Sequence, residues 1–249
     1  MALRLLPRRA TRPTPDAMTL SEHIAELRRR VTVSVLAFGV AAVLAWFLYP
    51  QLVSWLQHPY CQVSPGHCSF YVTRPLDGLS LRIKLSAYFG LFFASPIVLW
   101  ELWRFITPGL NRNEKRYAIP FIAASLTLFC AGAAVAFLAF PHALQFLNTV
   151  GGPSLHQILD PNAYLSLIVA LMAVFGLTFE FPVILVSLEL AGVLSWRTLS
   201  SWRRWAIVLI VLGAAIVTPS GDPFSMLALA VPLYVFYEVS ILIGRLLRR

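Results

Sequence analysis

The basic residues of this 249-residue chain lie almost entirely in every second gap between six apolar stretches. All but three of the 20 Lys and Arg residues precede the first stretch or follow the second, fourth or sixth. The three exceptions are Arg74, Arg82 and Lys84. In membrane proteins, the segments that stay in the cytoplasm are enriched in Lys and Arg. The pattern therefore predicts a membrane protein that crosses an even number of times, with both termini in the cytoplasm.

The composition agrees with a chain whose solvent is mostly lipid. Hydrophobic residues make up 58% of the chain, charged residues make up 12%, and the mean hydropathy is +0.73. A formal net charge of +9 would also suit a nucleic-acid partner. Here, however, the basic residues flank apolar stretches, so anionic lipid headgroups explain them more simply and no nucleic acid is expected.

Six transmembrane helices follow, because lipid requires each crossing to satisfy its backbone within a helix of about 20 apolar residues. The predicted spans are residues 31–48, 79–106, 117–140, 164–188, 205–218 and 224–244. The fifth would reach only about 21 Å, against a hydrocarbon thickness of roughly 30 Å. The sixth is equally short up to Glu238. We therefore predict that the last hairpin thins the bilayer locally, in preference to a re-entrant pair.

Two regions are expected in the chain. Residues 1–18 alternate Arg and Pro with small residues and show no helical period, which predicts a flexible basic arm attracted to lipid. Residues 19–249 form a single membrane domain of six helices. Thr19 and Glu22 have the spacing of a capping box, and an amphipathic helix is expected to lead from them into the first span.

Two acidic residues stand among the basic residues of the predicted cytoplasmic side. Glu26 lies three and four residues before Arg29 and Arg30, so an ion pair within one helix is the preferred interpretation on composition alone. Glu114 is followed at once by basic residues, and a salt bridge within its loop is the corresponding interpretation.

Glu180 is a carboxylate inside the fourth span and must be neutral, paired or hydrated there. An interhelical hydrogen bond from a protonated acid and a functional role are equally favoured. Pro182, two residues later, predicts a bend in this helix.

The remaining candidates are weaker. Glu101 and Glu189 lie near predicted cytoplasmic ends, where local pairing accounts for them, whereas Glu238 is deeper. Cys61 and Cys68 share an outer loop, and a disulfide between them is slightly favoured over two free thiols. Cys130 is expected to serve packing in the third span.

Three motifs lie in order along the chain: residues 23–28 precede the first span, residues 108–116 lie between the second and third, and residues 175–182 lie within the fourth. They read His-Ile-Ala-Glu-Leu-Arg, Pro-Gly-Leu-Asn-Arg-Asn-Glu-Lys-Arg and Phe-Gly-Leu-Thr-Phe-Glu-Phe-Pro, and Thr218-Pro219 opens the last hairpin. From about Thr19 to Gly244 the chain resembles the TatC family, the multispanning receptor subunit of the twin-arginine protein translocase. The resemblance implies a concave bundle of six helices with a short fifth and a short sixth helix.

This resemblance also implies a function. A TatC protein in the bacterial cytoplasmic membrane binds signal peptides of folded cargo that carry two adjacent arginines. It works with the single-span subunits TatA and TatB and other copies of itself, driven by the proton motive force. Glu26 and Glu114 match the carboxylates that recognise the arginine pair, with Arg28 and Phe105 as neighbours. Carboxylates suit this task, because an arginine fork binds a carboxylate through two hydrogen bonds and lysine cannot.

The resemblance places Glu180 in a polar groove that meets the signal peptide or a partner helix. Pro59 matches an outer-loop proline of the family, although a plain turn would also explain it. Asp222 lies where the family tends to carry an acid, but Gly221 shifts the local spacing.

Catalysis finds little support in the sequence. None of the five histidines lies in a span core, and neither a metal-binding helix motif nor a glycine-rich phosphate loop occurs. We therefore expect no enzyme activity, metal or cofactor. The main rival is a secondary transporter in which Glu180 carries a proton or ion, but the chain lacks the internal repeat typical of such proteins. An intramembrane protease is disfavoured, because its catalytic residues are missing.

Overall fold

The computed structural model describes residues 20–63, 70, 74–106, 118–150, 160–190, 192–218 and 221–246, so the predicted arm at residues 1–18 lies outside the described residues. Within these ranges the chain is helical and contains no strand, which confirms the predicted all-α class. The helices are α1 (Leu20–Phe47), α2 (Tyr49–Val63), α3 (Asp77–Ile106), α4 (Ala118–Val150), α5 (Pro161–Thr178), α6 (Phe181–Leu190), α7 (Trp196–Ser201), α8 (Arg203–Val217) and α9 (Pro223–Leu246).

Five helical segments of the described chain are long and apolar enough to cross a membrane. They are Ile24–Phe47, Asp77–Phe105, Ile119–Val150, Pro161–Leu190 and Pro223–Leu246. These segments coincide with the predicted first, second, third, fourth and sixth spans. At the predicted fifth span lies α8, whose 15 residues extend about 22 Å. This helix is short, as the sequence predicts.

The prediction of a short sixth helix is wrong. α9 continues through Glu238 and has 24 residues, about 36 Å at 1.5 Å per residue. The charge does not end the helix, because the Glu238 carboxylate accepts hydrogen bonds from Arg203 Nη2 at 2.9 Å and from the Tyr234 hydroxyl at 3.1 Å. A paired carboxylate of this kind can be accommodated near the end of a membrane helix.

A helix that the sequence did not predict, α2, follows α1 directly. Its 15 residues are too few and too polar to predict a span, and its stability comes from burying Leu56 and Tyr60 in the core. The Trp55 ring also stacks on Phe137 of α4, with centroids 4.4 Å apart. Pro59 is buried inside α2, so the alternative of a plain turn at Pro59 is wrong.

The fourth span is broken where the sequence predicts a bend. α5 ends at Thr178 and α6 begins at Phe181. Pro182 has no backbone N–H with which to bind the carbonyl of Thr178, one turn earlier, and its ring would clash with that carbonyl in a regular helix. Glu180 therefore lies at the break between two helices.

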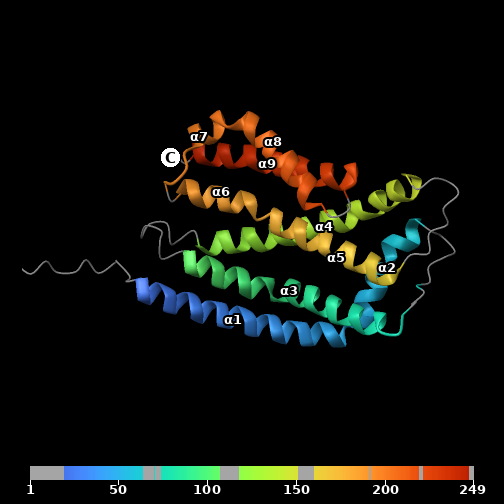
Figure 1. The fold of residues 1–249 in the computed structure, drawn as a ribbon. Coiled ribbons are helices and arrows are strands. Elements are labelled where there is room, and N and C mark those ends of the chain that lie inside the picture. The colour runs from blue at the N-terminus through green and yellow to red at the C-terminus, as the bar shows by residue number, and fades with distance from the viewer. Residues whose placement is uncertain are drawn as a thin grey trace, which may run out of the picture.

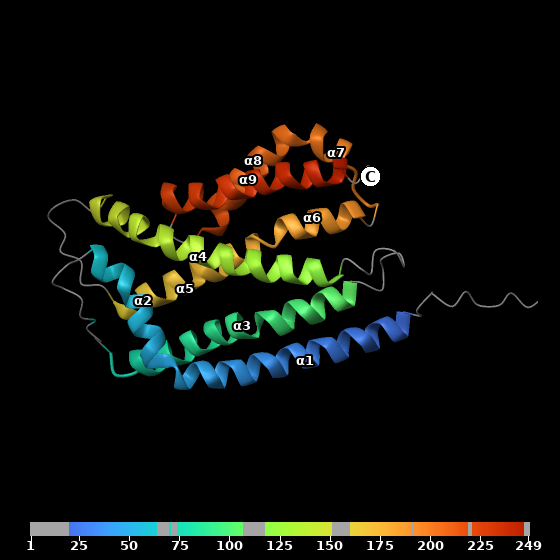
Figure 2. The same ribbon diagram turned by 180° about the vertical axis from the view of Figure 1, so that it is seen from behind.

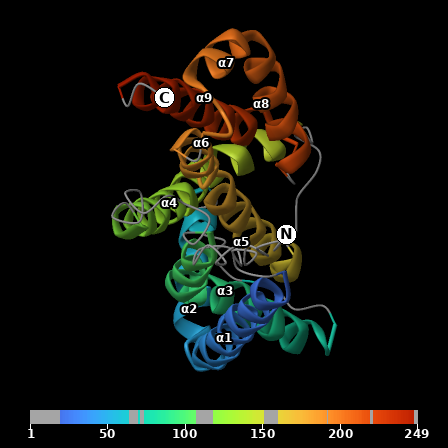
Figure 3. The same cartoon turned by 90° about the vertical axis from the view of Figure 1, so that its left-hand side faces the viewer.

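The helices form an elongated row instead of a round bundle (Figure 3). α1 packs mainly on α3, α3 contacts α4 and α5, α9 contacts α4 and α6, and α8 packs mainly on α9. α1 and α8 therefore lie at opposite edges of the row. Large apolar side chains are exposed along both edge helices, including Leu36 and Val40 on α1 and Leu212 and Ile216 on α8. Lipid tails are the solvent that such surfaces match.

The helices run roughly along one direction, and their basic ends gather at one end of the molecule. α1 begins there, α3 and α6 end there, α4 begins there, and the last turn of α9 lies there (Figures 1 and 2). Arg28, Arg104 and Arg245 belong to α1, α3 and α9, and Arg197 belongs to α7, which follows the end of α6. The basic segments that alternate along the sequence thus come together, in the described residues, at one end of the molecule. We call this end the basic end.

Candidate functional site

The first candidate site lies at the basic end, between α1 and α3. These helices approach closely because Gly90 of α3 faces Ala42 of α1, where an added Cβ at Gly90 would lie 2.7 Å from the Ala42 Cα. On α1, Glu26 and Arg30 are four residues apart and share one helical face. On α3, Glu101 lies in the second-last turn. The packing of the two helices brings Arg30 and Glu101 together.

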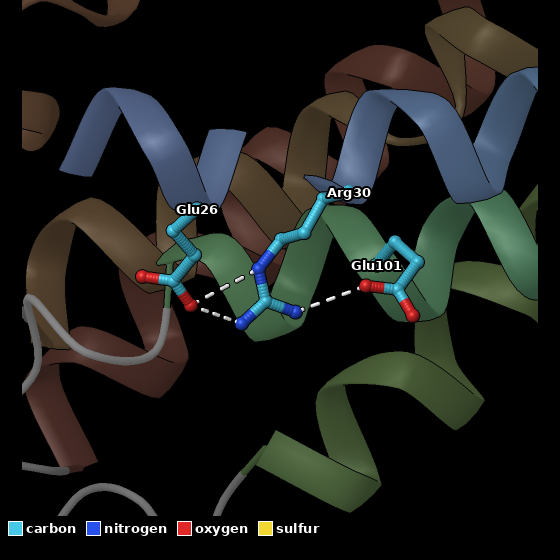
Figure 4. Close-up of polar contacts among 3 residues, drawn as sticks. All are labelled: Glu26, Arg30 and Glu101. Carbon is cyan, nitrogen blue, oxygen red and sulfur yellow. Dashed lines mark hydrogen bonds and ion pairs between the residues drawn. The ribbon is translucent and has the colours of Figure 1, made fainter. Parts of the chain in front are cut away.

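Arg30 binds both carboxylates at once, as Figure 4 shows. Its Nε donates to Glu26 Oε1 at 3.1 Å, and its Nη2 contacts the same oxygen. Its Nη1 donates to Glu101 Oε2 at 3.0 Å. All three side chains are largely shielded, with exposed fractions of 14% for Arg30, 21% for Glu26 and 15% for Glu101. One guanidinium thus lies between two carboxylates, and the set carries a net charge of −1.

The helical pair that the sequence favours for Glu26 is confirmed, with Arg30 as the partner. Two members of the cluster, Arg30 and Glu101, were not predicted as site residues. The i, i+4 spacing identifies Arg30 as a partner, whereas no local signal links Arg30 to Glu101, 71 positions away. We refer to Glu26, Arg30 and Glu101 as the guanidinium cluster.

An apolar groove runs from the guanidinium cluster along α1 and α3. Its volume is about 560 Å³, and Arg30 and Glu101 belong to its lining. The other lining residues are Leu27, Val31, Ser34, Val35, Phe38, Leu91, Val98, Leu102 and Phe105. Of the predicted residues, Phe105 lines this groove, and Glu26 contacts Arg30 of the lining. Arg28 is exposed on α1, and Glu114 lies outside the described residues.

The second candidate site surrounds Glu180, at the break between α5 and α6. Trp103 Nε1 of α3 donates to Ser125 Oγ of α4 at 2.7 Å, and the Ser125 side chain is hydrogen-bonded to Glu180. The Ser125 hydroxyl has one proton and two lone pairs, so it can accept from Trp103 and still share a hydrogen bond with Glu180. The predicted interhelical hydrogen bond of Glu180 is confirmed, with Ser125 as the partner, whereas donation from a protonated Glu180 stays a prediction. Glu180 is buried, and its Oε1 has no partner among the described residues. A functional role for Glu180 stays a prediction.

The other acidic candidates differ in their surroundings. Asp222 Oδ1 accepts from the backbone N–H of Ser225 at 2.7 Å and thereby caps the start of α9. Glu238 pairs with Arg203 across α9 and α8. The predicted local pairing of Glu189 is wrong: its carboxylate is buried against Gly244 of α9, and neither oxygen has a hydrogen-bond partner in the described part of the chain.

The cysteines divide into two groups. Cys61, near the end of α2, is disulfide-bonded, and Cys68 lies outside the described residues, so the pairing of these two stays a prediction. Cys130 of α4 is free and exposed, so the expectation that it packs in the interior is wrong. Among the described residues no group of three or more His, Cys, Asp or Glu side chains could hold a metal ion.

The long apolar helices and the charges gathered at one end define a multispanning membrane protein. The comparisons with known proteins specify it further. The family model for the Sec-independent protein translocase protein TatC matches residues 22–232. The chain belongs to the TatC family and is a subunit of the Sec-independent protein translocase. It is therefore a protein that takes part in the transport of other proteins. The alternatives of a proton- or ion-coupled secondary transporter and of an intramembrane protease lose their support.

Relatives come from several organisms. A TatC protein of Frankia casuarinae is 42% identical over 95% of this chain and 68% of its own length. A TatC protein of Aquifex aeolicus is 35% identical over 93% of this chain and 97% of its own. The crystal structure of the twin arginine translocase receptor TatC superposes with a TM-score of 0.77 at 35% identity, covering 92% of this chain and 100% of that one.

Proposed function

We propose that the chain is the receptor subunit that binds twin-arginine signal peptides of folded cargo, and that the guanidinium cluster is part of the binding site. The observation that carries this proposal is Arg30 held between Glu26 and Glu101. The same carboxylates are suited to a guanidinium that arrives from outside. Glu114, which lies between α3 and α4 in the sequence, would supply the carboxylate for the second arginine of the pair.

The chemistry of the cluster favours arginine over lysine. Nε, Nη1 and Nη2 of one guanidinium are all in use, and these three donors point in fixed directions. An ammonium group has its donors at a single atom and cannot reproduce that fork. The partial burial of the carboxylates adds to the difference, because water competes less for the hydrogen bonds.

The adjoining groove suits the rest of such a peptide. A signal peptide continues from its charged segment into an apolar segment. The groove begins at the guanidinium cluster and is lined by apolar side chains of α1 and α3 for several turns. Phe105 stands among the lining residues near the basic end, where the two segments would meet.

The proposal includes an orientation in the membrane, partner subunits and a source of energy. The basic end faces the cytoplasm, because Lys and Arg are retained on that side, and the membrane is the bacterial cytoplasmic membrane. TatA, TatB and further copies of the chain assemble on the receptor once cargo is bound. The proton motive force supplies the energy, about 2.3 kcal/mol per charge for each 100 mV. Glu180 would meet the signal peptide or a partner helix within the membrane.

Glu26→Gln tests the proposal. The variant loses the carboxylate that receives two of the guanidinium contacts, so its affinity for a twin-arginine peptide should fall about tenfold or more. Binding is measured with the purified, detergent-solubilised chain and a fluorescent signal peptide, and a photocrosslinker placed next to the arginine pair of the peptide reports the contact. A peptide whose arginine pair is replaced by two lysines should bind weakly to the unaltered chain.

Glu22→Gln is the matched control, because it removes one negative charge a turn earlier on α1, outside the guanidinium cluster. Its affinity should stay close to that of the unaltered chain. Two outcomes would contradict the receptor proposal. One is equal affinity of the unaltered chain for the arginine and lysine peptides. The other is equal affinity of Glu26→Gln and the unaltered chain for the arginine peptide.

A further inference from the structure

We infer that Glu101 is a positioning residue for signal-peptide binding: it retains Arg30 when an incoming arginine takes Glu26. This inference rests on the proposed function. In the free receptor Glu26 is already engaged by Arg30, so a signal peptide has to compete with a guanidinium of the receptor itself. The structure offers Arg30 a second carboxylate, and the exchange therefore leaves no cation unpaired.

The hydrogen bonds of Arg30 permit such an exchange. Glu26 is bound through Nε and Nη2, whereas Glu101 is bound through Nη1. The two carboxylates thus use separate edges of the guanidinium (Figure 4). Loss of Glu26 leaves the Nη1 bond in place, and a small rotation of the side chain offers a second N–H to Glu101. Arg30 does not have to leave the space between α1 and α3.

The charge balance supports the same sequence of events. Within the guanidinium cluster itself two carboxylates face one guanidinium, which is an excess of one negative charge. After the exchange the peptide arginine is paired with Glu26, and Arg30 is paired with Glu101. Two ion pairs then carry no net charge between them. Without Glu101 the exchange would strand a cation that is only 14% exposed, and the desolvation of unpaired charges is costly.

Helix packing keeps Glu101 in place throughout. Glu101 belongs to α3, which is fixed against α1 by the close approach of Gly90 to Ala42. Glu26 is one turn nearer the start of α1 than Arg30, and it is the most exposed of the three side chains. An incoming peptide therefore reaches Glu26 first and leaves Glu101 to the resident arginine.

A double-mutant cycle with Glu101→Gln and Arg30→Gln tests the inference. Glu101→Gln should weaken twin-arginine peptide binding about tenfold, because Arg30 loses its second partner. Arg30→Gln should bind at least as tightly as the unaltered chain, because it has no resident competitor. In the double variant the loss should disappear, with affinity within about twofold of Arg30→Gln. A role of Glu101 in folding alone would not produce this rescue.

Asp77→Asn is the matched control, since it exchanges an acid for its amide at the opposite end of α3. Thermal unfolding in detergent establishes that each variant is folded. If Glu101→Gln lowered the peptide affinity equally in the unaltered chain and in the Arg30→Gln variant, Glu101 would contact the peptide directly, and the inference would be overturned. The inference would also be overturned if Arg30→Gln alone lowered the peptide affinity fivefold, or if Glu101→Gln left the peptide affinity unchanged. A failure of the proposed function looks different, because the unaltered chain would then not distinguish arginine from lysine peptides.

Discussion

At the scale of single residues, a few buried polar side chains link helices that are far apart in the sequence. Ser125 is fully buried, yet its hydroxyl serves two helices at once, accepting from Trp103 and binding Glu180. In lipid such bonds matter chiefly because the unbonded groups would find no water. Glu26, Arg30 and Glu101 follow the same logic at the basic end, where every carboxylate is matched to a donor of Arg30.

Ser125→Ala should therefore lower the free energy of unfolding by about 1–3 kcal/mol, because it leaves both the Trp103 N–H and the Glu180 carboxyl without their shared partner. The midpoint of thermal unfolding in detergent provides the measurement. Thr127→Ala is the control on the same helix, since the Thr127 hydroxyl is exposed and bonds only to carbonyls of its own helix. A Ser125→Ala midpoint equal to that of Thr127→Ala would contradict the bridging role of Ser125.

At the scale of helices, small residues decide which surfaces meet. Gly90 lets α3 approach the backbone of α1 at Ala42, and Gly132 of α4 lets its helix approach the carbonyl of Phe175 on α5. At Gly244 of α9 the Glu189 carboxyl occupies the space that a Cβ would need. Membrane helices gain little from burying apolar surface against each other, so close packing of this kind supplies much of the attraction.

Gly90→Ala tests the contact that holds the guanidinium cluster together. The added methyl would lie 2.7 Å from Ala42 atoms, so α1 and α3 must separate. We expect a loss of about 1–3 kcal/mol in unfolding free energy and weaker twin-arginine peptide binding, because Arg30 and Glu101 move apart. Both quantities are measured on the purified chain.

Gly39→Ala on α1 is the control for this substitution, because a Cβ there would meet nothing within 4 Å. Alanine favours helix over glycine by up to about 1 kcal/mol, so Gly39→Ala should leave stability unchanged or raise it. If both variants gained stability equally, the close contact at Gly90 would not limit helix packing.

At the scale of the whole molecule, the row of helices combines long and short elements. α4 has 33 residues, whereas α8 has 15 and forms one edge of the row beside α9. A 15-residue helix falls short of the hydrocarbon thickness by roughly 8 Å. Bilayers adapt to a short helix by thinning. A thin region beside α8 would lower the barrier that folded cargo meets, once TatA has assembled there.

Lengthening α8 tests this idea. Four extra apolar residues before Thr218 add about one turn, or roughly 6 Å, and should relieve the thinning. We expect export of a folded twin-arginine reporter to slow severalfold, with signal-peptide affinity unchanged because the guanidinium cluster lies at the opposite edge of the row. The same insertion in α9, which already exceeds the bilayer thickness, is the control. Undiminished export by the chain with the longer α8 would rule out thinning as a requirement.

Sequence alone determined the features that depend on neighbours along one helix and on the choice between lipid and water. The apolar helices, the alternating charge, the break before Pro182 and the Glu26–Arg30 pair are of this kind, because helical spacing and solvent preference are local properties. Tertiary structure decided the rest. Glu101 as the partner of Arg30, Ser125 as the link between Trp103 and Glu180, the burial of α2 and the continuation of α9 past Glu238 all depend on which helices touch. Apolar sequence does not encode that choice, because every lipid-facing surface is equally apolar and only the shapes and hydrogen bonds of a few residues select the neighbour.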